Sequence, residues 1–433
     1  MPDFNPAQTL VRNAWETTVE IPTETGWHYH DFVSETLSTE PGAIQDPSIT
    51  DAGEEPVDLE SKIDTNGVLN VVLNAEGHAH YLAKFMEHSE TPTNLTGGAY
   101  SHKLAPGETD VDFPETMTIE VSRDDGMPQL HKGADVTGVN FSLSPRGLLT
   151  TAFTILSARA DYWKGANQTT GSGGPNPTLR GLLNYDNWVL ADPNVYVKCI
   201  SAAGKTFRVK RGSASSYNSI DQTWGTAATW YPMYDEQATP ERLGTRALET
   251  EIYFPNFTSL ADNDVWQFDA ARAVWVPTYP DVPKFNEIYA FIYIDSAAFR
   301  LKQFTLNCTK PGEADFNIGG RYADEIIKRG RRSYRGTLNR RYVSTELRKR
   351  LESGKAFTFQ LVCTTGVIVG TSAYEHTFKA TSMNCKFTGR TPVVGGQSQL
   401  DENLNFSCHP SDDGTYPNAM TFELINSIAS LAA

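Results

Sequence analysis

The sequence predicts a mainly β protein, and three observations lead to this fold class. Apolar and polar residues alternate with a period of two in many short segments, which is typical of antiparallel strands with one buried face. Few segments have the spacing of a helix, and the two clearest are short. A series of short peptides recurs in the same order in both halves of the chain, which indicates an internal duplication.

The strands are expected where alternation is strict, at Met117–Ser122, Val139–Leu143, Val195–Cys199 and Phe207–Val209. One helix is expected within 76–88, with a buried side formed by Tyr81, Leu82 and Phe85. A second is expected over Ser344–Ser353, because Ser344 can cap its start and Gly354 follows its end.

The internal repeat is visible in short matched peptides. Thr36–Gly42 returns as Thr305–Gly312 with one inserted residue, and Gly67-Val-Leu returns as Gly336-Thr-Leu, 269 residues later. Each copy continues with a helix and further strands. The later matched pairs are Thr116–Val121 with Phe357–Val362, and Val136–Leu143 with Ala380–Phe387 at a spacing of 244. The conserved order predicts two copies of one β unit.

Three domains follow from this pattern. Residues 1–160 form the first β domain, which includes an acidic segment at 31–64, and residues 295–433 form the second. Residues 161–294 form an inserted β-rich domain, which holds six of the eight Trp and ends in the apolar run Phe285–Ile294, expected to be a strand buried on both faces. The acidic segment has ten carboxylates against Lys62 and is expected to be an exposed, partly ordered loop.

Composition excludes several classes of function. No apolar run reaches the roughly 18 residues of a membrane span, and the first residues lack the basic and apolar regions of a secretory signal. A net charge of −15 disfavours general DNA packaging. No catalytic or nucleotide-binding signature is present, and no paired carboxylates suggest a glycoside hydrolase. We therefore expect neither an enzyme nor a cofactor.

The cysteines and histidines do not predict a metal site. The five cysteines stand apart without a CxxC pair, and four of them fall on apolar strand faces: Cys308, Cys363, Cys385 and Cys408. We expect small buried thiols in a reducing cytoplasm. The pairs His28/His30 and His78/His80 lack a third clustered ligand, so we expect surface or interface histidines.

A basic cluster stands out between Arg321 and Arg350, with eleven Lys and Arg against three acids. It could dock on an acidic surface of a neighbouring copy, such as Asp31–Asp64, form a solvated loop, or contact nucleic acid. Self-association is favoured because charge complementarity sets the register of assemblies.

With these residues in place, the two copies resemble the tail tube proteins of tailed bacteriophages. The second copy is the better match, and the first resembles the family through Gly133–Ser144. The resemblance covers roughly 20–160 and 295–425. The peptides of the second copy that carry it are Phe304-Thr-Leu-Asn, Gly336–Tyr342, Phe357–Leu361 and Phe387–Gly396. It implies two tandem tube domains, each a β-barrel or β-sandwich with one short helix, plus an inserted decoration domain.

The resemblance further implies a structural protein of the virion. Its homo-oligomer would be a ring of three chains with pseudo-sixfold symmetry, or of six chains, and stacked rings would form the channel for genome ejection. The partners implied are the chain itself, a tape measure protein and double-stranded DNA bound without sequence specificity, with no membrane. The tube would be assembled in the host cytoplasm and located in the virion tail. The alternative is a β-sandwich binding protein that recognises a carbohydrate or host surface through the Trp- and Tyr-rich middle block.

Two sets of residues are candidates for these roles. The polar faces of two strands are expected to line a net negative channel, through Thr118, Glu120, Ser122, Thr358 and Gln360. The basic cluster is expected to contact the adjacent ring, through Arg321, Lys328, Arg329, Arg331 and Arg332.

Overall fold

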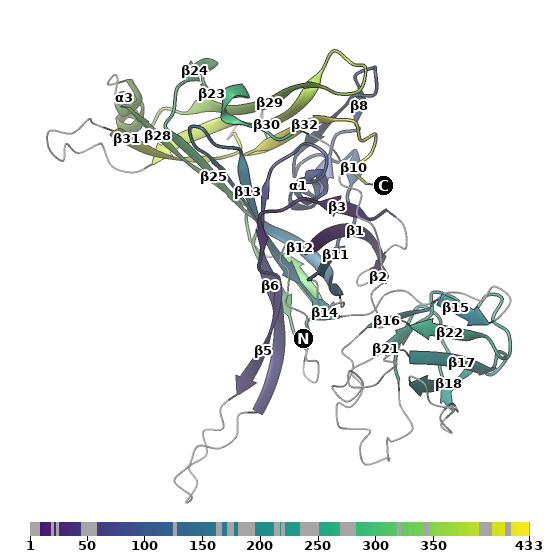
Figure 1. Ribbon diagram of the computed structural model, residues 1–433. Helices are drawn as coiled ribbons and strands as arrows, with labels where there is room; N and C mark the ends of the chain where they lie inside the picture. The colour runs from purple at the N-terminus through teal and green to yellow at the C-terminus, as the bar shows by residue number, and fades with distance from the viewer. Residues whose placement is uncertain are drawn as a thin grey trace, which may run out of the picture. The chain divides into compact units, whose positions relative to one another are not determined.

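The computed structural model describes residues 9–18, 21–22, 26–44, 59–123, 128–161, 167–170, 177–180, 195–211, 217, 221–233, 251–268, 283–317, 322–328, 330–341, 346–388, 401–411 and 417–432. It confirms a mainly β fold (Figure 1). The helical elements of these ranges are α1 (Ala79–Met86), α3 (Glu346–Ser353) and the 3-10 turn η3 (Glu287–Tyr289). None of them is long and apolar enough to cross a membrane.

The chain folds into two compact units. Unit 1 comprises Met1–Leu10, Ile119–Lys132 and Ala160–Pro277, and unit 2 comprises Val11–Thr118, Gly133–Arg159 and Thr278–Ala433. Unit 1 overlaps the inserted domain expected at 161–294, whereas residues of both expected repeats lie together in unit 2.

Unit 1 has two sheets around one core. The first sheet contains β15 (Asn167–Thr170), β22 (Val265–Phe268), β17 (Val195–Ser201), β18 (Thr206–Arg211) and β19 (Gln222–Thr223). The second contains β16 (Thr178–Arg180), β21 (Glu251–Tyr253) and β20 (Trp230–Pro232). Phe207 and Trp266 of the first sheet pack in the same core as Ile252 of the second. Trp224 and Trp266 are therefore core residues and not a surface platform, while Trp163, Trp188 and Trp275 lie outside the described residues.

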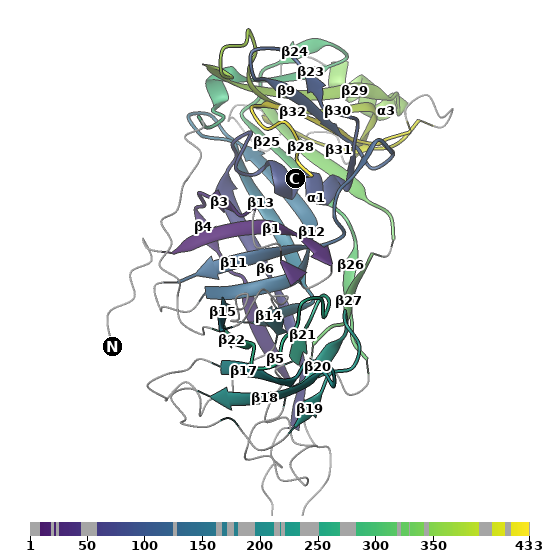
Figure 2. The ribbon, with the colours of Figure 1, turned by 90° about the vertical axis from the view of Figure 1, so that its right-hand side faces the viewer.

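Unit 2 is built on one long antiparallel sheet (Figures 1 and 2). Its strands follow one another through these pairings: β4 (Ser34–Glu35) and β5 (Ser38–Ile44) at one end, then β6 (Leu59–Val72), β13 (Thr150–Ser157), β12 (Pro128–Leu143), β25 (Gln303–Thr309), β28 (Ser333–Arg341), β31 (Asp401–Cys408) and β30 (Glu375–Thr388). The second half of this order repeats the first, since β25, β28, β31 and β30 follow one another as β5, β6, β13 and β12 do.

The register of the strands tests the repeat residue by residue. Ser38 pairs with Asn66, and the residues 269 positions later, Asn307 and Arg335, also pair. The spacing of 244 for the last strand is wrong. Val136 pairs with Ile155, which pairs with Gly67. In the second repeat, Phe387 pairs with Phe406, which pairs with Gly336. Alternating apolar residues fit several shifts, and a bulge between Val136 and Gly138 changes the phase.

The other strands of unit 2 belong to further parts of the same sheet, except β26 and β27, which form a separate two-stranded sheet. They are β1 (Leu10–Thr18), β2 (Ile21–Pro22), β3 (His28–His30), β7 (His88–Ser89), β8 (Thr93–Asn94), β9 (Tyr100–Leu104), β10 (Val111–Asp112), β23 (Ala290–Ile294), β24 (Ala297–Phe299), β26 (Gly312–Asp315), β27 (Glu325–Lys328), β29 (Phe357–Ile368) and β32 (Thr421–Asn426). Four strands contribute residues to both units: β1 and β12 named above, and two further strands, β11 (Met117–Ser122) and β14 (Arg159–Asp161).

Helix α1 lies in the core of unit 2, and all of its residues are buried. The Tyr81 ring lies between His30 and Phe153, with centroids 4.9 and 5.1 Å away, which confirms its place on the buried side. Helix α3 is more exposed, although Gly354 follows it in a left-handed conformation (φ 62°), as expected for a C-terminal glycine. Ser344 lies outside the described residues.

Two expectations about local structure are wrong. The run Phe285–Ile294 is not a strand buried on both faces, because η3 occupies its middle and Phe291 of β23 is 47% exposed. In its described part the acidic segment 31–64 is not mainly a loop, because β5 and β6 pair along it from Ser38 to Ile44. Acidic side chains can alternate on the solvent face of a hairpin, so charge density alone does not indicate a loop.

Gly336 allows close packing between two strands of the sheet. A Cβ at this position would overlap the ring of Phe406, the residue directly opposite on β31. Because Phe406 is itself buried, we expect Gly336→Ala to lower the free energy of unfolding by about 1–3 kcal/mol, as measured by urea denaturation. Asn307→Ala on the exposed face should change it by less than about 0.5 kcal/mol. Equal effects would show that the ring moves away freely.

Candidate functional site

One face of the unit 2 sheet is mainly polar. Directly paired residues of antiparallel strands point to the same side, so the registers place side chains in rows across the sheet. One row contains Ser34, Asn70, Ala152, Asn140, Asn307, Arg335, Ser407 and Lys386. A second contains Val72, Thr150, Ser142, Thr305, Thr337, Asn405 and Thr388. All these residues are exposed or half-buried, and we call them the polar face.

Hydroxyl and amide groups dominate the polar face and bond to one another. Thr337 donates to the Asn405 side-chain oxygen at 3.0 Å, and the Asn70 amide donates to Ser34 at 2.9 Å. The only charged residues in the two rows are Arg335 and Lys386. The net negative wall that we expected is therefore not found in these rows, which contain no carboxylate.

The opposite face of the same sheet is apolar and covered. One of its rows contains Leu69, Phe153, Val139, Cys308, Tyr334, Cys408 and Cys385, all buried. All five cysteines are buried free thiols, as expected from their positions on strands. This sheet thus presents one face to the core of unit 2 and the other to its surroundings.

The two repeats meet within the chain through their strand edges. β12 of the first repeat pairs with β25 of the second, from Gly138 opposite Thr309 to Leu143 opposite Phe304. The junction continues both rows of the polar face without a break. The β12 edge of the first repeat therefore accepts the β25 edge of the second.

Each end of the sheet leaves one such edge available among the described residues. At one end, the Thr36 N–H donates to the Val68 carbonyl, so Thr36, Ser38 and Glu40 face β6 and the intervening residues Thr39 and Pro41 face away. Proline has no N–H to offer, which suits a position on an edge. At the other end, residues 386–388 of β30 pair only with β31 in the described part of the chain.

Three of the candidate channel-lining residues are not on the polar face. Thr118, Glu120 and Ser122 are completely buried, and Thr118 donates to the Glu16 carboxylate at 2.6 Å. The alternation of β11 suggested an exposed polar side, but other parts of the chain cover both sides of this strand. We therefore do not assign these residues to a channel wall.

Thr358 and Gln360 are half-buried on β29, which pairs with β23 and β30 outside the rows of the polar face. The Thr358 N–H donates to Asp295 at 2.8 Å, and the Gln360 amide donates to Thr381 at 3.4 Å. Their role in a channel stays a prediction.

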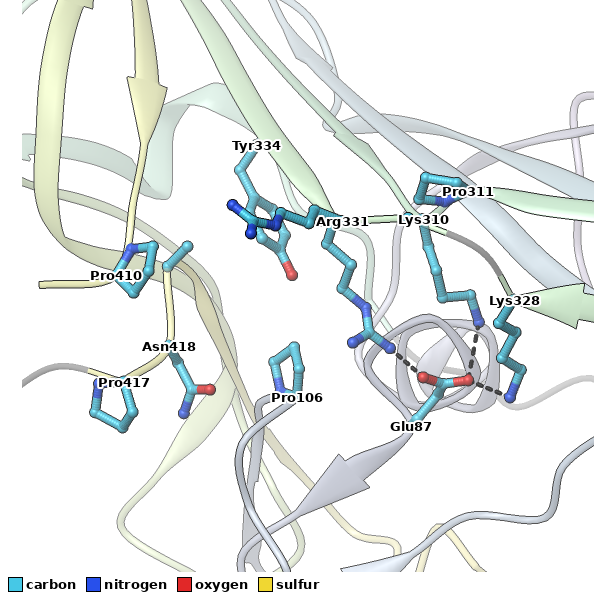
Figure 3. A pocket seen from close by; sticks show the side chains of 13 residues that line it. Glu87, Pro106, Lys310, Pro311, Lys328, Arg331, Tyr334, Pro410, Pro417 and Asn418 are labelled. Carbon is cyan, nitrogen blue, oxygen red and sulfur yellow. Dashed lines mark hydrogen bonds and ion pairs between the residues drawn. The ribbon is translucent and has the colours of Figure 1, made fainter. Parts of the chain in front are cut away.

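A basic pocket of about 350 Å³ lies elsewhere in unit 2 (Figure 3). Its lining includes Lys310, Lys328, Arg331 and Arg332 around one carboxylate, Glu87. The rest of the lining includes Tyr334 and the prolines Pro106, Pro311, Pro410 and Pro417. We call this cavity the Glu87 pocket.

Glu87 is the centre of the charges in this pocket. It follows α1 in a left-handed conformation (φ 72°) and forms ion pairs with Lys310 at 3.4 Å and with Lys328 and Arg332. Burial alone would raise the pKa of this carboxyl, but the three cations outweigh it and lower the pKa to about 2. The residues that line the pocket therefore have a net positive charge.

The residues expected to contact an adjacent ring partly belong to this pocket. Lys328 and Arg332 pair with Glu87 of the same chain, whereas Arg331 is exposed at the pocket. Arg321 and Arg329 lie outside the described residues. Sequence reasoning missed Glu87, because nothing in the residues around this acid indicates that three cations from distant parts of the sequence contact it.

The histidine pairs meet in the core, which corrects the expectation of surface or interface histidines. The His28 and His80 rings stack with centroids 4.0 Å apart, and those of His30 and His78 lie 5.9 Å apart. His30, His78 and His80 are fully buried. In the described residues, no three His, Cys, Asp or Glu side chains are placed to hold a metal ion.

In a comparison with known proteins, no protein-family model and no curated protein matches the sequence.

Proposed function

We propose that this chain is a structural subunit that assembles through its sheet edges into a ring, and that stacked rings form a tube for the passage of DNA, as in phage tails. The β12–β25 junction carries the proposal. It joins two equivalent repeats edge to edge and leaves an edge at each end of the sheet. Repeating this contact between chains is a head-to-tail association, which closes into a ring when the rotation permits.

The polar face supports a role as the wall of the channel. It crosses both repeats without interruption, so rings built by edge pairing would have a continuous polar surface. Hydroxyl and amide groups give phosphate no array of cations to bind, and each cation that is present would add to the affinity for DNA. A wall with only Arg335 and Lys386 in its two rows would therefore let DNA slide.

Blocking one edge should prevent assembly without unfolding the chain. Thr39→Pro removes an N–H that faces away from β6 and so breaks none of the bonds between β5 and β6. We expect the wild type to form rings or tubes in negative-stain images. The variant should remain a single chain by mass photometry, with an unchanged circular dichroism spectrum and melting temperature.

Ser144→Pro, in an exposed turn away from both edges, is the matched control and should assemble like the wild type. A wild-type protein that stays a single chain at high concentration would contradict the proposal. Ring formation by the Thr39→Pro variant would show that β5 does not form the contact.

A further inference from the structure

The Glu87 pocket has more positive than negative charge. Four cations line it and one carboxylate faces them, and Arg331 at its mouth is exposed with no ion pair in the described residues. Lys310 also forms an ion pair with the buried Asp135 at 2.7 Å, whereas Lys328 is 38% exposed. A second carboxylate could therefore bind here without displacing the first.

A segment with the complementary charge follows β5. Residues 45–58 contain five carboxylates and no Lys or Arg: Asp46, Asp51, Glu54, Glu55 and Asp58. This segment links β5 to β6, and the hairpin that carries it extends beyond the sheet, because β13 pairs with β6 only from Thr65 onwards (Figure 1).

The described end of this hairpin lies far from the pocket of its own chain. Lys310 follows Thr309, whose row in the sheet leads through Gly138 and Thr154 to Val68. From Val68 to Leu59, where the acidic segment ends, β6 advances by about 30 Å at the usual rise per residue. Half of the segment, about seven residues, spans at most about 24 Å when fully extended, which is less than this distance.

We propose that the Glu87 pocket of one copy binds the acidic segment 45–58 of a second copy. Because each chain has one pocket and one segment, the contact is directional and can be repeated indefinitely. It rests on the proposed tube, in which it would join one ring to the next, with the prolines at the rim confining the bound peptide.

A labelled peptide of residues 44–59 tests the pocket with the full-length protein. We expect it to bind in fluorescence anisotropy at low salt and to bind more weakly at high salt. Arg331→Glu should weaken binding by at least about tenfold relative to Arg300→Glu, which makes the same charge change at an exposed site outside the pocket. A peptide with all five carboxylates as amides should not bind.

Equal affinities of the two variants, or binding of the amide peptide, would overturn the pocket assignment whether or not rings form. A full-length chain with the five amides should form rings that do not stack, because its β5 edge is unchanged. Normal tubes from this chain would also contradict the inference. Peptide binding by a protein that never forms rings would support the pocket while refuting the tube.

Discussion

Acidification to pH 5 is expected to destabilise unit 2, with roughly 2 kcal/mol lost for each of three buried histidines. Burial lowers the pKa of His30, His78 and His80 below the usual 6.5, to about 3 for His78. These side chains are therefore neutral in the folded chain, while the unfolded chain binds protons below pH 6.5. Their contribution to stability is complete above pH 6.5 and is lost as the pH falls towards the folded values.

The surroundings of the cluster offer little compensation for a proton. Asp31 is 3.7 Å from His78 but also pairs with Lys284, and the Asn13 side-chain oxygen is 2.5 Å from His30. His28 stacks on His80, whose ring also contacts Trp15 edge-on. Neither ring nitrogen of His80 has a hydrogen-bond partner within the described residues.

Urea denaturation at pH 7.5, 6.5, 5.5 and 5 measures this effect. The pKa of Glu87 is lowered to about 2 in the folded chain, so its contribution to the free energy of unfolding is lost only below about pH 4.5. All four pH values lie above this limit, and the contribution of Glu87 therefore stays constant. His80→Phe should remove about 2 kcal/mol of the loss at pH 5, and Asn307→Ala at an exposed site should remove none. A free energy of unfolding that is constant over this range would contradict the prediction.

Asp135→Asn is expected to lower the free energy of unfolding by about 3–5 kcal/mol, because it removes the carboxylate that lies between two buried ammonium groups. The Asp135 oxygen lies 2.7 Å from Lys310 and 3.5 Å from Lys84, and all three side chains are at most 4% exposed. Burial lowers the pKa of Lys84 to about 8, against the opposing effect of Asp135. Since Lys84 is on α1 and Lys310 follows β25, this pair of contacts connects the two repeats.

Thermal and urea unfolding of Asp135→Asn should be compared with Lys379→Met. Lys379 pairs with Glu423 at 2.9 Å, but both side chains are about 30% exposed, so its loss should cost less than about 1 kcal/mol. Similar effects of the two substitutions would mean that water reaches the Asp135 cluster in the folded state.

The sequence predicted what depends on local pattern. Alternation identified the strands and the buried cysteines, and the paired peptides at Thr36 and Thr305 identified a repeat whose first two strands keep the same register. The side chains of Tyr81 and Phe85 are buried as expected, but so is every other residue of α1.

What the sequence could not predict depends on contacts between distant segments. β11 alternates like a surface strand, but Glu16 reaches Thr118 from the first strand of the chain. The four histidines are clustered because β3 packs on α1, and the basic residues converge on Glu87 from more than 200 positions away. A period of two says which residues share a face, but not what covers that face.

The last residues of unit 2 close the first repeat, which has a consequence for biosynthesis. β32 pairs with β9, the Phe422 ring stacks near Phe85 of α1, and the Trp15 indole donates to the Leu431 carbonyl at 2.8 Å. A ribosome releases residues in order, so the nascent amino-terminal half waits with an uncovered helix until residues 421–431 emerge. Prematurely terminated chains would lack this cover and would expose the helix to proteases.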